Sequence, residues 1–117
     1  MSQDLKAGDF LVFQLEAGFG LLRLLAIDET NGAKAFHVAA YDDFFPDVDS
    51  AEAAAIESRL KIGNPHMALT ERAFESTQTA RIVNQPLEDA ELDSLRAWQE
   101  GSREVSDKSV RLLLGLR

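Results

Sequence analysis

Two histidines are the side chains of this sequence best suited to acid–base chemistry near neutral pH. His37 lies within the apolar run AFHVAAY, and His66 follows Asn64-Pro65. A catalytic triad also needs a placed acid and a serine exposed on a sharp turn, and no G-x-S-x-G motif occurs in the sequence. Both histidines are therefore better interpreted as packing residues, and we predict that the protein is not an enzyme.

Carboxylates gather in the segment 41–52, YDDFFPDVDSAE, around two adjacent phenylalanines and a proline. Such side chains could bind a hard cation, but an EF-hand loop places them at alternating positions before a glycine and a distal glutamate. Here Phe45-Pro46 interrupts the spacing, and no glycine follows Asp49. We predict no metal site here, and no cofactor, because the chain also lacks cysteine and a glycine-rich phosphate loop.

The two phenylalanines give the same segment another interpretation. We expect one of Phe44 and Phe45 to anchor the segment to the core, and the other to be exposed beside the acids, where it could contact a partner protein. Alternatively, both rings fix the loop ahead of the following helix, because aromatic residues usually bury their large apolar area internally. The partner-binding hypothesis assigns the contact to Asp42, Asp43, Phe44, Phe45, Asp47 and Asp49.

A ligand pocket on a curved sheet is the alternative location for function. His37 and Tyr41 fall on one face of an extended strand, because their separation is an even number of residues. Arg23, on a neighbouring strand, could join them. A small enzyme or ligand-binding domain would then place its pocket around His37, Tyr41 and Arg23.

These side chains must be positioned by strands that come first in the chain. Three apolar segments are typical of strands: 10–15 (FLVFQL), 21–27 and 35–41. The connection 16–20, EAGFG, carries two glycines, and Asn31-Gly32 suits a hairpin turn because both residue types tolerate positive φ. The sequence therefore predicts an antiparallel meander whose first strand is covered on both faces.

The rest of the chain mixes helices and strands. We predict a helix over 50–62, capped by Asp49 with Glu52 and closed by Gly63, and a second helix over 87–100. We also predict strands at 66–70 and 79–83, and alternation of apolar residues predicts a final strand at 109–116, whereas 71–78 is ambiguous. The order predicts one α+β domain over residues 1–117, with a strongly bent antiparallel sheet or small half-open barrel of five to six strands and two helices.

Composition narrows the partners. The chain of 117 residues has a net charge of −8, and its 12 basic residues are scattered, so we predict no direct nucleic-acid binding. An acidic surface could steer a basic protein partner, or could serve solubility alone. The lack of cysteine, of a signal peptide and of an apolar run long enough to cross a bilayer predicts a cytoplasmic protein without membrane contact.

The opening of the chain resembles a known family. Gly8-Asp9 precedes the apolar strand FLVFQL, then come Gly18-Phe-Gly20 and a second strand that carries Arg23. This pattern, over about the first third of the chain, is similar to immunity protein 26, a bacterial family encoded beside polymorphic toxins. The resemblance implies a non-enzymatic protein that neutralises a cognate toxin by binding it. A homodimer formed through strand edges is a further alternative.

Overall fold

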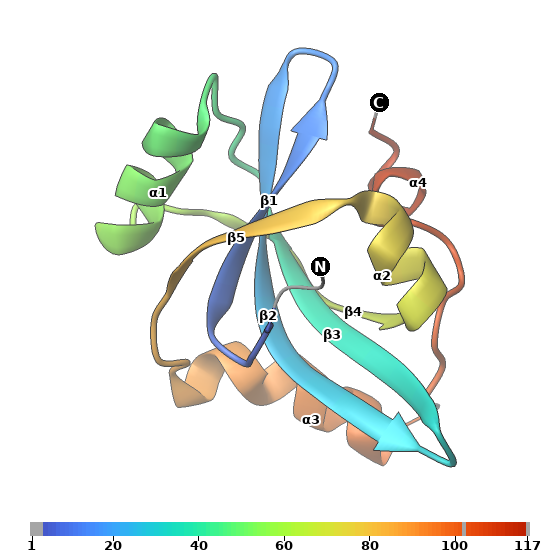
Figure 1. Cartoon of the computed structure of the whole chain (residues 1–117). Helices are drawn as coiled ribbons and strands as arrows, with labels where there is room; N and C mark the ends of the chain where they lie inside the picture. Colours follow the sequence, from blue (N-terminus) through green and yellow to red (C-terminus); the bar gives the residue numbers. More distant parts are fainter. Residues whose placement is uncertain (1–3, 102, 117) are drawn as a thin grey trace.

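The computed structural model describes residues 4–101 and 103–116. Five strands form one antiparallel sheet in the order β4-β3-β2-β1-β5. Its end strands are not paired with each other, so the sheet is not closed into a barrel (Figure 1). The strands are β1 (Asp9–Leu15), β2 (Gly18–Thr30), β3 (Ala33–Tyr41), β4 (Ile62–Thr70) and β5 (Thr79–Asn84). The α+β prediction is confirmed.

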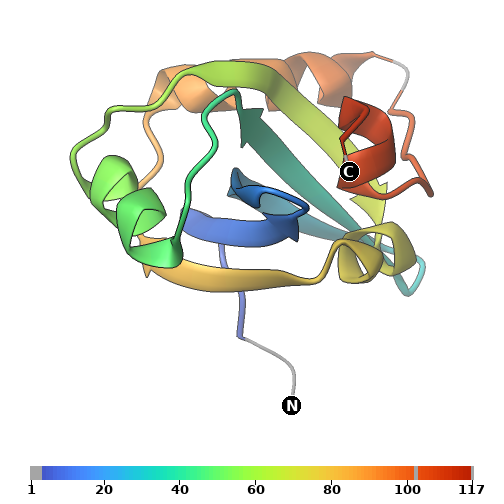
Figure 2. The ribbon, with the colours of Figure 1, turned by 90° about the horizontal axis from the view of Figure 1, so that it is seen from above.

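Helices cover both faces of the sheet, as the view in Figure 2 shows. They are α1 (Val48–Ile56), α2 (Glu71–Thr77), α3 (Asp93–Glu100) and α4 (Val110–Leu114), and a 3-10 turn, η1 (Asp89–Leu92), precedes α3. Four α-helices in the described chain are two more than the sequence predicted. None of the helices in this part of the chain is long and apolar enough to cross a membrane.

The core divides according to the alternation of side chains along the strands. Leu11 and Phe13 of β1 join the cluster under α2 and α4, whereas Phe10 and Val12 point to the opposite face under α1. A third cluster on that opposite face packs Leu25 and other residues of β2 and β3 against α3. β1 is therefore apolar almost throughout because both of its faces are covered, as predicted.

The first hairpin is tighter than the sequence predicted. Gly18 to Gly20 belong to β2 and pair with β1, so the turn is only Glu16-Ala17. Gly20 stands opposite Phe13 in this pairing and leaves room for its ring, because a Cβ on Gly20 would lie 2.4 Å from that ring. The second hairpin turn is confirmed, since Asn31 and Gly32 have φ of 53° and 81°.

The first helix begins and ends earlier than predicted. Asp47, not Asp49, caps α1, because its carboxylate accepts a hydrogen bond of 2.7 Å from the amide of Ser50. The helix ends at Ile56, and Ser58 beyond it has a positive φ of 56°. The predicted helical residues 57–61 therefore form a connection into β4, and Ile62 and Gly63 lie in that strand rather than at a helix end.

The predicted final strand, 109–116, is wrong. Ser109 caps a short helix there, and Gly115 ends it in the left-handed conformation. Val110 of α4 is fully buried, and its amide donates to the hydroxyl of Thr77 at the end of α2. Within the ambiguous segment 71–78, residues 71–77 form α2, which Thr70 caps at its start and Gln78 ends in the left-handed conformation. The hydrogen bond between Val110 and Thr77 joins the two short helices.

Candidate functional site

The acidic segment 41–52 is fixed to the first hairpin at one residue. The backbone of Phe45 exchanges two hydrogen bonds with Phe19 of β2, of 2.8 and 2.9 Å. Gly18, with φ of 149°, permits this approach, because a Cβ there would lie 2.5 Å from the carbonyl oxygen of Phe45. Phe45 itself is partly buried against the cluster under α1.

Two of the predicted carboxylates have structural roles. Asp43 accepts a hydrogen bond of 2.7 Å from the amide of Lys61, which holds the segment to the start of β4. The hydrogen bond from Ser50 lowers the pKa of Asp47 below its usual range. Asp49 lies in the first turn of α1, where a negative charge favours the helix dipole. Asp42 is exposed, although its carboxylate lies where a Cβ on Gly63 would be.

Phe44 remains in the open while its neighbours are fixed. It is 55% exposed and lies between two surface hollows of about 140 and 340 Å³. Among the described residues, the charged side chains that line these hollows are acidic, Asp42 in the first and Glu16 in the second. We call this surface the Phe44 patch, and it comprises Leu15, Glu16, Phe19, Asp42, Phe44 and Leu116. The expectation of one anchored and one exposed phenylalanine agrees with this geometry.

A second constellation lies on the sheet, under α3. The Nε2 atom of His37 lies 2.8 Å from a carboxylate oxygen of Asp28, and its Nδ1 lies 2.9 Å from Nε2 of His66. His37 of β3 stands opposite Ala26 and Ala68 in the sheet. Asp28 lies two residues from Ala26 on β2, and His66 lies two residues from Ala68 on β4. Because side chains alternate along a strand, Asp28, His37 and His66 share one face of the sheet.

This row of side chains is protected from water at its centre. His37 is fully buried, and the ring of Trp98 from α3 meets it edge-on at 4.5 Å between centroids. Burial lowers the pKa of His37, although the nearby carboxylate of Asp28 acts in the opposite direction. Burial, together with the neighbouring His37, lowers the pKa of His66 to about 4. Both imidazoles are therefore neutral at pH 7.

The other residues of the predicted ligand pocket lie elsewhere on the same face. Arg23 is 3% exposed, and its guanidinium donates to the carbonyls of Gly8 and Pro86 at 2.8 and 3.2 Å. It also lies over the ring of Phe10, with which Tyr41 stacks at 6.0 Å. Burial raises the pKa of Tyr41 to about 12. Arg23 and Tyr41 thus meet at Phe10, whereas His37 contacts Asp28, His66 and Trp98.

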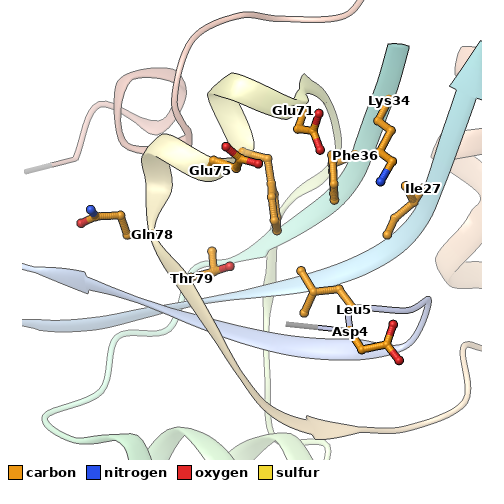
Figure 3. A pocket seen from close by; sticks show the side chains of 10 residues that line it. Asp4, Leu5, Ile27, Lys34, Phe36, Glu71, Glu75, Gln78 and Thr79 are labelled. Atoms are coloured by element: carbon orange, nitrogen blue, oxygen red, sulfur yellow. The ribbon is translucent and has the colours of Figure 1, made fainter. Parts of the chain in front are cut away.

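The largest of the described hollows lies on the opposite face of the sheet, beside α2 (Figure 3). Its volume is about 600 Å³, and the rings of Phe36 and Phe74, stacked at 4.3 Å, form part of its lining. Glu71, Glu75 and Lys34 extend around it in the close view. It contains neither a histidine nor any of the residues that the sequence predicted for function.

Sequence reasoning expected one exposed phenylalanine at position 44 or 45 without deciding which, and it missed the row of Asp28, His37 and His66. The three residues come from three strands, and only the pairing of β2, β3 and β4 brings them together. No protein-family model, curated protein or solved structure matches the chain.

Proposed function

We propose that this chain is a binding protein that docks a partner protein on the Phe44 patch and acts without a chemical step there. The observation that carries the proposal is the exposure of Phe44 beside a fixed backbone. Phe45 holds the segment to β2 on one side, and Asp43 holds it to β4 on the other. An aromatic side chain on a pre-ordered segment loses little conformational entropy on binding, which favours its use as an interface anchor.

The charges of the patch define the chemistry of the partner. Asp42 and Glu16 border the apolar surface, and the chain as a whole carries a net charge of −8. A partner that inserts an apolar side chain beside Phe44 and surrounds it with Lys or Arg would match this surface. Association would be fast at low ionic strength and slower in salt, because complementary charge acts mainly on the encounter.

The resemblance of the first third of the chain to immunity protein 26 supports one class of partner, a bacterial toxin that the chain inhibits by binding. Many toxins of such systems act on nucleic acids and have basic clefts, which an acidic surface with an aromatic anchor would complement. The residues that carry the resemblance include Gly18 and Phe19, which hold Phe45 in place. We propose that an immunity role would use the same surface as the docking proposal.

Affinity capture from native lysate tests the proposal with a matched pair of variants. Phe44 and Ile56 are exposed to nearly the same extent, 55% and 53%, but Ile56 lines neither hollow of the patch. We expect Phe44→Ser to lose a partner that Ile56→Ser keeps, and we expect high salt and Asp42→Asn to weaken the same capture. Retention of every salt-sensitive partner by Phe44→Ser, or an equal loss with Ile56→Ser, would overturn the proposal.

A further inference from the structure

The row of Asp28, His37 and His66 has a defined arrangement of protons. A carboxylate only accepts hydrogen bonds, so the proton between Asp28 and His37 sits on Nε2 of His37. Neutral His37 then has a lone pair on Nδ1, and the proton of the second hydrogen bond must come from Nε2 of His66. Neutral His66 consequently carries its own lone pair on Nδ1.

This last lone pair has no hydrogen-bond partner among the described residues. Within residues 4–101 and 103–116, one side-chain nitrogen, Nε of Arg23, is both buried and without a hydrogen-bond partner. Nδ1 of His66 also makes no hydrogen bond there, and because it is not among the buried atoms, part of its surface is accessible to solvent. The lowered pKa of His66 keeps this nitrogen unprotonated over the physiological range. His66 therefore presents a fixed acceptor and no ring donor to the surroundings.

His66 lines a surface groove together with several apolar residues. The groove has a volume of about 500 Å³, which is within the range of small-molecule sites. Its lining consists of His66, Met67, Ala68, Trp98, Glu104, Val105, Ser106 and Leu113. The segment that bears Val105 is held against β4, because Ser106 pairs with Ala68 and Thr70 through backbone hydrogen bonds of 2.8 and 2.9 Å. The groove is thus built from ordered elements.

We propose that this groove binds a flat apolar molecule that donates one N–H to Nδ1 of His66. The indole of Trp98 and the side chains of Val105 and Leu113 supply apolar contact for such a ring. The nitrogen of that indole is already used, since it donates to the carbonyl of Glu104 at 2.7 Å. Glu104 lines the same groove, and the guanidinium of Arg103 lies over the ring of Trp98 at 5.5 Å, so charges of both signs border the site and neither a cation nor an anion is selected. The ligand class is therefore a neutral heteroaromatic N–H donor.

Asp28 and His37 are positioning residues in this proposal. They touch no ligand but fix the tautomer of His66, because His37 can accept only from a protonated Nε2. In the free protein, both imidazoles should therefore be protonated on Nε2 and unprotonated on Nδ1. Nitrogen-15 NMR of the histidine rings reads this directly, and protonation of Nδ1 in His66 at neutral pH would overturn the assignment.

Indole and 1-methylindole are the probes for binding, because the methyl group removes the N–H and leaves the ring. We expect NMR titration of the whole chain to give about two- to tenfold tighter binding of indole, the range that one net hydrogen bond supplies. The nitrogen-15 resonance of Nδ1 in His66 should move with indole and not with 1-methylindole. Equal affinity of the two probes, no binding of either, or an unmoved Nδ1 resonance would overturn the proposal.

Two variants locate the effect. His66→Phe keeps a flat ring but removes the acceptor, so the preference for indole over 1-methylindole should fall to about one. Phe44→Ser is the matched control, because Phe44 does not line this groove and the preference should be unchanged. A preference that survives in folded His66→Phe would contradict the role of His66. The nitrogen-15 measurement on the wild-type chain decides the question if His66→Phe does not fold.

Discussion

The Phe44 patch and the histidine row differ in how the chain assembles them. Phe44 is exposed within one contiguous segment, and its surroundings are fixed by backbone hydrogen bonds and a helix cap. The histidine row is buried at its centre and takes one residue from each of three strands. The patch could thus change in sequence with little effect on folding, whereas the row is part of the fold itself.

His37→Ala should show the largest effect on stability. It removes a fully buried side chain and leaves both Asp28 and Nε2 of His66 without their partner. We expect the free energy of unfolding to fall by about 4 kcal/mol, from the cavity and the lost hydrogen bonds together. Urea denaturation followed by circular dichroism measures it. A loss below about 1 kcal/mol would mean that the row does not support the sheet.

Acid should destabilise the row more than the patch. The pKa of His66 is about 4 in the folded chain and 6.5 in its ordinary state, so the unfolded chain binds more protons between these values. The contribution of neutral His66 to the free energy of unfolding should be fully present above pH 6.5 and should be lost as the pH drops to 4. Below pH 4 this group causes no further loss. We expect a fall of about 2 kcal/mol, because solvent around the partly buried ring screens part of the full effect. Burial lowers the pKa of His37 too, which acts in the same direction.

Denaturation series between pH 7.5 and 4 measure this effect, and His66→Phe is the control. The variant lacks the group, so its stability should depend less on pH in this window than that of the wild type. Equal slopes for the two proteins would contradict the lowered pKa of His66.

Gly18→Ala tests the contact that joins the patch to the sheet. The new Cβ would meet the carbonyl of Phe45, and the residue has a positive φ, so we expect a loss of about 2 kcal/mol and a displaced segment. Gly115→Ala is the control, since Gly115 also has a positive φ but a Cβ there would meet no atom within 4 Å. The contact is unimportant if the two variants lose equal stability.

The cap of α1 should have a smaller effect. Asp47→Ala removes the acceptor for the amide of Ser50 and should lower the midpoint of thermal unfolding. Asp49→Ala removes only a favourable charge in the first turn, so its effect on thermal unfolding should be smaller. Thermal unfolding of both variants measures the difference. The reverse order would restore the cap to Asp49, where the sequence had indicated it.

The features that could be predicted from the sequence depend on residues close together in the chain. The strand FLVFQL and the Asn31-Gly32 turn follow from local pattern and chemistry, whereas the sequence left open which of Phe44 and Phe45 would be exposed. The segment 109–116 was wrongly predicted as a strand because its apolar residues alternate with period two, although Ser109 and Gly115 are good helix caps. The row of Asp28, His37 and His66 depends on strand register, which a single sequence does not specify.

Phe44→Ser should have the smallest effect on stability, within about 0.5 kcal/mol, because the side chain is largely exposed. Its effect on partner binding should nevertheless be the largest among exposed residues. This combination separates a functional aromatic residue from a structural one. A loss of several kcal/mol in urea denaturation would show that Phe44 serves the fold instead.

Site-specific photocrosslinking in native lysate tests the docking surface most directly. A benzophenone side chain placed at position 44 should yield a discrete adduct with another protein, and the adduct should weaken in high salt. The same group at position 56 should yield none. No adduct from position 44, equal adducts from both positions, or an adduct with a second copy of this chain alone would contradict the account.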